Sequence, residues 1–336
     1  MNRLRILSAG IIFLFAAASC IPDIPGKGLS AHYAAVLNGS LLIAGGCNFP
    51  DGPAYEGGAT AYYKDIFILA SGGWKEAGRL PKESAYGASA SDGNTLYIAG
   101  GASTDGESDT FLSISIKDGK AALTCLPSMP KPVQQSAAVL TGSAFYVLGG
   151  YNSDGPNLEV LEYDFSESSW SSYAELPLPL VQPVAAWHDG ALYIWGGYDP
   201  STRKAVCRGF CLKDGVWSEL PGVPDGGTLV GSAYAMSDDR LYITGGVNNE
   251  VFDYALTLDV EQTKIYQQHP TEYYRFRSDI YCFDFKSQNW IPAGNEPESA
   301  RAGAVLVIKD GRLVNTGGEI RPCVRDPRVF IFDIEP

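Results

Sequence analysis

The chain has 336 residues, 45% of them hydrophobic, and a formal net charge of −13 at pH 7. This acidic balance argues against binding to a nucleic-acid backbone or to an anionic membrane surface, so an anionic ligand would need a local cluster of arginines. Residues 20–336 are enough for one large domain or two ordinary ones.

The N-terminus has the pattern of a secretory signal. Arg3 and Arg5 precede an uncharged apolar run over residues 6–18, which is too short to span a bilayer. The run is followed by Ser19-Cys20, and Ala-Ala-Ser-Cys resembles the bacterial lipobox, in which cleavage leaves a lipidated cysteine. We therefore predict a lipoprotein signal peptide over residues 1–19 and a lipid anchor on Cys20. An ordinary signal peptide with an incidental cysteine is the alternative.

The residues after Cys20 bear on location. Ile21 and Pro22 follow it, and the absence of an aspartate there favours the outer membrane. We expect an envelope protein that meets the membrane only through its lipid and faces the periplasm, although the sequence does not distinguish this from a surface-exposed position. Six further cysteines permit disulfides, but their spacing dictates no pairing, and no spacing suggests a zinc site.

Six glycine pairs recur along the chain, each directly after a short apolar run such as LLIAGG, LYIAGG or LYIWGG. They are Gly45-Gly46, Gly100-Gly101, Gly149-Gly150, Gly196-Gly197, Gly245-Gly246 and Gly317-Gly318. Another apolar run and a turn precede each pair. A third run follows most of them, and then a tryptophan or an apolar fourth run. Each unit therefore predicts four short strands.

This unit resembles the kelch repeat of β-propellers, in which one repeat forms one four-stranded blade. Six units predict an all-β protein, a single six-bladed propeller over residues 20–336. A two-sheet sandwich is the alternative, but it does not predict the repeat. We expect the glycine pairs where strands crowd the central axis, since only glycine lets backbones approach so closely.

The sixth unit is expected to have only three strands, because its third run, RVFIFDIEP at residues 328–336, is the last segment of the sequence. A bare strand edge would remain in the ring. Residues 21–27, IPDIPGK, read like the end of a fourth strand without its tryptophan. We predict that this segment pairs weakly with the last blade and closes the ring.

Strand direction predicts which loops share a face of the ring. Because strands in a blade are antiparallel, the loop after each glycine pair and the start of each first strand lie at the same mouth of the central channel. Residues 319–327, Tyr86 and Arg301 belong to this mouth. The turn after His188 falls on the opposite face, which makes this histidine a poor catalytic candidate.

Two loops at the mouth are long. One covers residues 47–65, and the other follows Gly246, where Trp290 comes 44 residues later, against the 20 residues from Gly150 to Trp170. The second contains YQQHPTEYYRFRSD. Long loops on a rigid ring commonly carry binding groups, and aromatic, amide and guanidinium groups suit sugars. Loops that only pack against one another are the alternative.

Four segments in chain order sharpen this interpretation: AGGCNFPDGPAYEGG, SAYGAS, HPTEYYRFRSDIYCFD and ARAGAV…NTGGEIRPCVRD. They resemble the cyclically permuted branch of the N-acetylneuraminate epimerase family, the kelch-type sialic acid mutarotases. The family motif, a glycine pair, Glu-Ile, a basic residue, Pro and then Arg, implies that Glu319 and Arg325 are catalytic. Cys323 stands where the family usually has glycine. If that position needs a positive φ, cysteine would strain the loop and displace Arg325.

The residues themselves support compatible chemistry. Mutarotation of a 2-keto sugar acid needs a base for the anomeric hydroxyl and an acid for the ring oxygen, and it requires no metal or redox cofactor. Glu319 can serve as the base, and arginines nearby would favour its ionised form. An arginine fork also suits the substrate carboxylate. Our candidate substrate-binding residues are Arg301, Arg321, Tyr86, Asn48 and Arg275.

We therefore predict a mutarotase that interconverts the α and β anomers of N-acetylneuraminate or a related sugar acid, with no cofactor and no nucleic-acid partner. The main alternative is a non-catalytic propeller that binds carbohydrate or a protein partner in the envelope, because a fold does not decide function. A sialidase is not supported, because Asp-box repeats are absent. A copper oxidase needs a histidine pair at the mouth, and the chain has only His32, His188 and His269.

Overall fold

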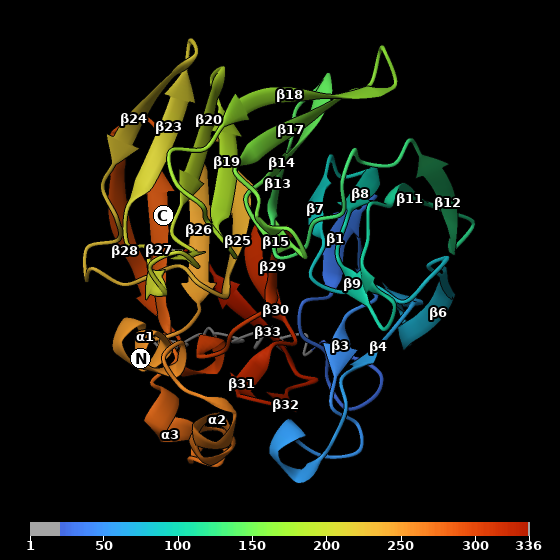
Figure 1. Cartoon of the computed structure of the whole chain (residues 1–336). Coiled ribbons are helices and arrows are strands. Elements are labelled where there is room, and N and C mark those ends of the chain that lie inside the picture. The colour runs from blue at the N-terminus through green and yellow to red at the C-terminus, as the bar shows by residue number, and fades with distance from the viewer. Residues whose placement is uncertain (1–20, 335–336) are drawn as a thin grey trace, which may run out of the picture.

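The computed structural model describes residues 21–334, so the expected signal peptide, Cys20 and the last two residues lie outside the described part. Six antiparallel sheets stand around a central axis, and the chain is a six-bladed β-propeller, as predicted (Figure 1). The innermost strands of consecutive blades contact each other, and those of the last blade contact the first. The ring is therefore closed in chain order.

The blades are built from consecutive strands, with the innermost strand first. Blade one contains β1 (Tyr33–Leu37), β2 (Ser40–Ala44), β5 (Asp65–Ala70) and β6 (Gly73–Arg79). Blade two contains β7 (Ala88–Ser91), β8 (Thr95–Ala99), β11 (Phe111–Lys117) and β12 (Lys120–Leu126). Blade three contains β13 (Ala137–Leu140), β14 (Ala144–Leu148), β17 (Glu159–Asp164) and β18 (Ser169–Glu175).

The second half of the ring follows the same order. Blade four contains β19 (Val184–His188), β20 (Ala191–Trp195), β23 (Gly209–Lys213) and β24 (Val216–Leu220). Blade five contains β25 (Ser232–Ser237), β26 (Arg240–Gly245), β27 (Asp279–Asp284) and β28 (Asn289–Asn295). Blade six contains β29 (Val305–Lys309), β30 (Arg312–Thr316) and β33 (Val329–Asp333).

Short hairpins follow the glycine pairs at the mouth in five blades. They pair β3 (Cys47–Asn48) with β4 (Ala61–Tyr62), β9 (Ala102–Ser103) with β10 (Gly106–Glu107), β15 (Tyr151–Asn152) with β16 (Gly155–Pro156), β21 (Tyr198–Asp199) with β22 (Lys204–Ala205), and β31 (Glu319–Arg321) with β32 (Val324–Arg325). In blade five the hairpin is replaced by α1 (Asn249–Ala255), α2 (Val260–Tyr266) and α3 (Thr271–Tyr274). Single 3-10 turns are η1 (Ala54–Glu56) and η2 (Pro297–Ser299).

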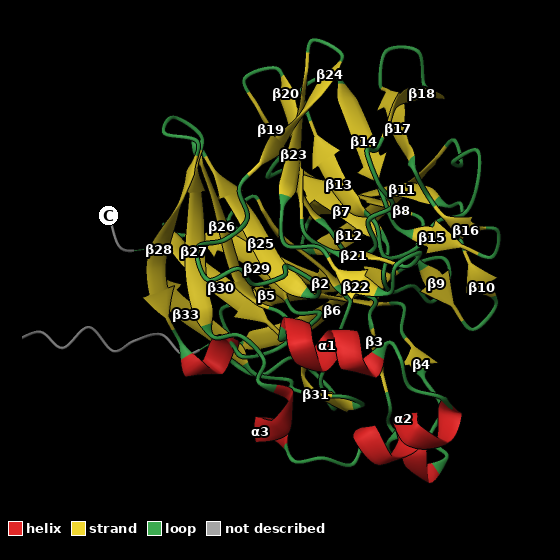
Figure 2. Cartoon of the chain, turned by 60° about the vertical axis from the view of Figure 1, so that its left-hand side comes forward, coloured by secondary structure: helices red, strands yellow, loops and turns green. Residues whose placement is uncertain are grey.

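The helical insertion lies on the mouth side of the ring, near β31 and β3 (Figure 2). Asn248 caps α1 by accepting from the Val251 N–H, and Asp259 with Gln262 forms a capping box at α2. The long loop was predicted, but helices were not, because helices of seven residues are too short for a clear period. Among the described helices, none is long and apolar enough to cross a membrane.

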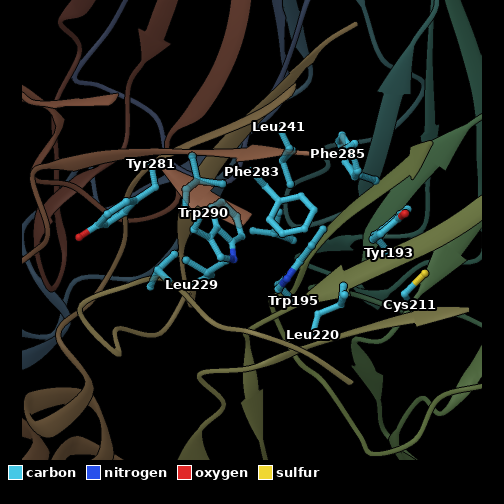
Figure 3. Packing of buried hydrophobic residues seen from close by; sticks show 14 of the residues in the cluster. Tyr193, Trp195, Cys211, Leu220, Leu229, Leu241, Tyr281, Phe283, Phe285 and Trp290 are labelled. Carbon is cyan, nitrogen blue, oxygen red and sulfur yellow. The ribbon is translucent and has the colours of Figure 1, made fainter. Parts of the chain in front are cut away.

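Side chains between neighbouring blades form the core. One cluster lies between blades four and five around Trp195, Phe283 and Trp290 (Figure 3). The ring centroids of Trp195 and Phe283 are 4.7 Å apart, and those of Trp195 and Trp290 are 5.5 Å apart. Successive strand residues point to opposite faces, so each blade buries one set against each neighbour. Replacing the fully buried Trp195 with alanine would cost about 3–5 kcal/mol.

The glycine pairs are required by conformation and by space. Gly317 and Gly318 have φ of 59° and 97°, values that residues with a Cβ rarely adopt. A Cβ on Gly317 would lie 2.5 Å from the Leu29 carbonyl oxygen, and one on Gly45 would lie 2.4 Å from the Ser84 carbonyl oxygen. We expected the glycine pairs to be crowded by strands at the central axis. The backbone atoms that crowd them belong instead to the connectors that lead from one blade to the next.

The N-terminal segment lies where the outermost strand of blade six would end, as predicted. In three blades the tryptophan of the outermost strand donates to a carbonyl at the end of the preceding blade: Trp170 to Pro127, Trp217 to Glu175 and Trp290 to Pro221. Trp74 of blade one makes the equivalent bond, at 2.8 Å, to the carbonyl of Pro22. Pro22 therefore stands where the fourth strand of blade six would end.

A backbone hydrogen bond of Ile24 also has an equivalent in blade one. The Ile24 N–H donates to the Pro327 carbonyl at 2.7 Å, as the Leu80 N–H donates to the Lys64 carbonyl in blade one. Ile24 is buried beside β30 and β33. The closure is partial within residues 21–334, since the sheet of blade six contains three strands there.

Candidate active site

Six residues with left-handed backbones form a ring at the mouth, which we call the collar. They precede the innermost strands at equivalent positions, with φ of 52–69°, and are Ala31, Tyr86, Gln135, Gln182, Gly231 and Gly303. Five backbone hydrogen bonds of 2.7–3.0 Å join them from blade to blade: Ala31 N–H to Gly303, Tyr86 to Ala31, Gln135 to Tyr86, Gln182 to Gln135, and Gly303 to Gly231. The innermost strands line a cavity of about 620 Å³ that reaches the collar.

A second layer of equivalent residues lies next to the collar. The residue directly after each glycine pair forms a backbone hydrogen bond to the residue just before a collar residue. The six residues that follow the glycine pairs are Cys47, Ala102, Tyr151, Tyr198, Val247 and Glu319. We call them the mouth layer. In blade six the Glu319 N–H donates to the Ala302 carbonyl at 2.8 Å, and the Ala302 N–H donates back at 2.9 Å. The loops predicted to rim the mouth therefore do so.

Glu319 and Arg325 meet in the hairpin of β31 and β32. They are register partners, and Arg325 Nη1 donates to Glu319 Oε2. The Arg325 side chain is 5% exposed and that of Glu319 is 23% exposed, so the carboxylate stays accessible while the guanidinium is covered. The guanidinium carbon lies 5.2 Å from the ring centroid of Phe49, in the first long loop. The two predicted catalytic residues are thus together, although they are not among the residues that line the cavity.

One edge of the Arg325 guanidinium is not used by the protein. Nη1 binds Glu319, whereas Nε is buried and has no hydrogen-bond partner within residues 21–334. Nε–H and one Nη–H form a parallel pair of donors, which is the geometry that binds a carboxylate bidentately. An unpaired donor edge therefore lies beside the Glu319 carboxylate, covered in this structure, and a ligand would have to displace the groups that cover it.

Cys323 has a φ of 66° in the turn between β31 and β32. The position therefore needs the left-handed conformation that glycine adopts most easily, and cysteine there carries a cost of about 1–3 kcal/mol. Arg325 nevertheless contacts Glu319, so the displacement considered from the sequence does not occur. The Cys323 thiol is buried, which raises its pKa, and it interacts with the backbone of Ala54 in η1. The six cysteines in the described part of the chain are all unpaired.

Tyr86 belongs to the collar and lines the cavity. Its hydroxyl accepts from the Cys47 thiol at 3.4 Å. Burial raises the pKa of Tyr86, and the neighbouring Cys47 raises it further, while the Arg325 guanidinium opposes them. The phenol is therefore protonated at neutral pH, and its own proton remains free to be donated to a ligand.

Arg301 lies in the wall beneath the motif, where its donors bind the protein. It is 1% exposed, and it donates to the carbonyls of Glu298 and Gly317 and to the carboxylate of Asp326. Its guanidinium carbon also lies 4.6 Å from the ring centroid of Phe330. These contacts give Arg301 a structural role in holding the carbonyl of Gly317, the first glycine of the sixth pair, and the residue after β32. They leave it little capacity for substrate.

Asn48, Arg275 and Arg321 have three different surroundings. Asn48 is buried, and both ends of its amide bond backbone groups. Arg275 ends α3 and forms an exposed ion pair with Glu250 at 3.0 Å, and none of its contacts involves the β31–β32 hairpin. Arg321 donates to the His269 carbonyl at 3.4 Å, which connects the motif to the helical insertion. Of the nominated binding residues, Arg321 belongs to the motif and Tyr86 lines the cavity, whereas Arg301 and Asn48 are engaged by protein groups.

The sequence analysis missed two mouth residues, Tyr151 and Tyr198. Both follow a glycine pair, as Glu319 does, and that shared position is the signal that could have identified them. Burial raises the pKa of Tyr151, and it raises that of Tyr198 to about 12. Tyr62, the register partner of Cys47, adds a third phenol whose pKa burial raises.

The fold and the mouth define a six-bladed β-propeller with a carboxylate–guanidinium pair at the mouth of its central channel. A family model described as N-acetylneuraminate epimerase matches residues 19–123 and 126–336. The chain therefore belongs to the N-acetylneuraminate epimerase family.

Individual relatives align over shorter stretches. The N-acetylneuraminate epimerase of Haemophilus influenzae (strain PittEE) is 32% identical over 123 residues, 33% of this chain and 32% of that protein. The one of Pasteurella multocida (strain Pm70) is 30% identical over 124 residues, 34% and 33% of the two chains. The one of Brucella suis is 31% identical over 106 residues, 29% and 27%. The aligned stretches thus span about a third of these relatives or less.

Proposed function

We propose that this protein is a mutarotase that interconverts the α and β anomers of N-acetylneuraminate or a closely related sugar acid, without a cofactor. The observation that carries the proposal is the Glu319–Arg325 pair, held at the mouth of the ring with an unused guanidinium edge. Membership of the family and the printed names of the relatives support the substrate class.

Binding of the substrate carboxylate by Arg325 would set the geometry of the reaction. In a 2-keto sugar acid, the carboxylate and the anomeric hydroxyl are both attached to the anomeric carbon. A carboxylate held by the free edge of Arg325 therefore brings the anomeric hydroxyl toward Glu319, whose second carboxylate oxygen makes no bond to the guanidinium. This also explains how a chain with a net charge of −13 can hold an anion.

Glu319 then acts as the base. It takes the proton of the anomeric hydroxyl, the O–H electron pair becomes the second C–O bond of a ketone, and the bond from the anomeric carbon to the ring oxygen breaks. The ring oxygen receives a proton from the Glu319 carboxyl or from the protonated Tyr86 phenol. Rotation of the open chain exposes the other face of the ketone, and the reverse steps close the ring. Such proton transfer accelerates a reaction roughly 10²- to 10⁴-fold.

Proton NMR of freshly released α-anomer tests the activity. Wild-type protein should accelerate the decay of the α-anomer signals, and Glu319→Gln should lose roughly 100-fold or more of that acceleration. Glu250→Gln is a matched control, because Glu250 is an exposed carboxylate whose arginine partner lies outside the motif. An unchanged decay rate with wild-type protein would reject the activity and favour the non-catalytic alternative. Full acceleration with Glu319→Gln would reject the residue assignment.

We also propose that the mature protein is anchored to the outer membrane through a lipid on Cys20. The support is the lipobox-like sequence and the position of Pro22, which is held at the seam between the last and first blades. The anchor would then attach at the rim of the ring. Mass spectrometry of the N-terminal peptide checks this proposal, and Cys20→Ala should release the protein from the membrane fraction. An unmodified Cys20 in membrane-bound protein would contradict it.

A further inference from the structure

Tyr151 and Tyr198 occupy the side of the mouth opposite to the Glu319–Arg325 pair. Tyr151, Tyr198 and Glu319 all belong to the mouth layer, so their backbones are equivalent in blades three, four and six. Consecutive blades are neighbours around the ring, so blade three lies across the axis from blade six, and blade four is next to it. At the same position in blade one, the Cys47 thiol reaches inward to the collar hydroxyl of Tyr86. The two phenols therefore face the mouth from its far side.

The hydroxyls of these two tyrosines are not used by the protein. Both side chains are half-buried, and neither hydroxyl has a hydrogen-bond partner within residues 21–334. Tyrosines that serve the fold do have partners: Tyr33 with Ser84, Tyr146 with Glu162 and Tyr274 with the Tyr266 carbonyl, at 2.6–2.7 Å. Neither hydroxyl is among the buried atoms of the described residues, so both are open to the mouth and available to a polar ligand.

Two collar residues with side-chain amides lie on the same side of the mouth as the two tyrosines. Gln135 and Gln182 line the cavity, and the Gln182 amide nitrogen donates to the Gln135 side-chain oxygen at 2.9 Å. This bond orients both side chains and leaves the Gln135 NH₂ group and the Gln182 oxygen available. The collar residues nearest to blade six are Ala31, Gly231 and Gly303, which have no polar side chains. The polar groups of the mouth thus include the motif in blade six and this set beside blades three and four, with Tyr86 of the collar between them.

The phenol set is held in place and stays protonated. The Tyr198 ring packs edge-on against Phe252 of α1, with centroids 5.4 Å apart. Burial keeps the pKa values of both phenols above the ordinary value, so both hydroxyls can donate as well as accept near neutral pH. Aromatic faces with free hydroxyls, together with amide donors and acceptors, suit the alternating C–H and O–H groups of a sugar chain.

We propose that Tyr151 and Tyr198, with Gln135 and Gln182, bind the polyhydroxylated tail of the sugar acid, the end remote from its carboxylate. This inference rests on the proposed function: with the carboxylate on Arg325 and the anomeric carbon beside Glu319, the rest of the molecule extends across the mouth toward blades three and four. These residues then select sugar acids with a long tail over those with a short one.

The test compares N-acetylneuraminate with its analogue whose glycerol tail has been shortened by two carbons through periodate oxidation and reduction. Tyr151→Phe and Tyr198→Phe keep the rings and remove only the hydroxyls. Each should raise KM for the full substrate about three- to tenfold with little change in kcat, as expected for the loss of one neutral hydrogen bond. The same variants should leave KM for the shortened analogue unchanged. Tyr173→Phe, on the outer strand of blade three and 41% exposed, is the matched control.

A binding measurement separates this inference from the proposed function. The methyl α-glycoside of N-acetylneuraminate cannot open its ring, so its affinity, measured by titration calorimetry, reports the site without catalysis. Weaker binding by Tyr151→Phe in a protein that does not exchange anomers would support the tail site and reject the mutarotase. Wild-type kinetics and affinities in both variants, in an active enzyme, would overturn the tail site. Neither exchange nor binding by wild-type protein would reject both.

Discussion

Acidification from pH 8 to pH 5 should weaken the seam between the first and last blades through His32. This residue is 3% exposed, and burial lowers its pKa to about 3. Nε2 lies 2.9 Å from Thr316 Oγ1, whose own hydroxyl donates to the Val305 carbonyl at 3.0 Å. His32 must therefore donate from Nε2. Nδ1 is then an acceptor, and it has no partner in the described part of the chain.

The sign of the effect follows from the unfolded chain, in which a histidine has a pKa of about 6.5. Between pH 3 and pH 6.5 the unfolded state binds a proton at His32 that the folded state does not, so the free energy of unfolding falls as the pH falls. The loss at pH 5 is about 1.5 pKa units at 1.36 kcal/mol each, or roughly 2 kcal/mol. Above pH 7 the loss is absent.

Urea unfolding at pH 8, 6 and 5 measures this loss. His32→Gln does not titrate in this range and can still donate to Thr316, so the difference between wild type and variant cancels the contributions of other groups. Wild type should lose about 2 kcal/mol more than the variant between pH 8 and pH 5. His269→Gln, in the helical insertion, should behave as wild type. Parallel pH profiles for wild type and His32→Gln would refute the reasoning.

Three further predictions concern the motif and the seam. Cys323→Val should lower the free energy of unfolding by about 2 kcal/mol and slow anomer exchange, because a β-branched residue is strongly disfavoured at positive φ. Cys323→Gly should keep the activity, and equal activity of the two variants would contradict this. Arg301→Met should cost about 3–5 kcal/mol in urea unfolding by leaving a buried carboxylate short of a partner, and Asp326→Asn in the same chain should recover part of the loss. Trp74→Phe removes one hydrogen bond to the N-terminal segment, so it should cost about 1 kcal/mol and speed amide exchange at Ile24; unchanged exchange would count against closure by this segment.

Local sequence determined the parts of the site that lie within one hairpin. Glu319 and Arg325 are six residues apart around a tight turn, and the turn alone brings them into register. The sequence repeat determined the architecture of the ring. Six glycine pairs in register specify six blades, and the antiparallel direction of the strands specifies which loops share the mouth. The position of residues 21–27 beside the last blade also followed, because the sixth unit has only three strands.

The roles of the other arginines were decided only by the tertiary structure. Arg301 and Arg275 look alike in sequence, yet one is buried among carbonyls and a carboxylate, and the other is exposed beside Glu250. What a guanidinium does depends on which acceptors the fold brings within reach of a long side chain, and those acceptors come from residues distant in sequence. Composition and spacing contain no such information.

The two tyrosines on the far side of the mouth also show what sequence and tertiary structure each determine. Tyr151 and Tyr198 share their place after a glycine pair with Glu319, so the repeat determines where they stand. Whether their hydroxyls are paired or free depends on every neighbouring blade at once, and the assembled ring leaves them without a partner among residues 21–334. Periodicity thus determined positions around the axis, while packing between blades decided which groups remain available for chemistry.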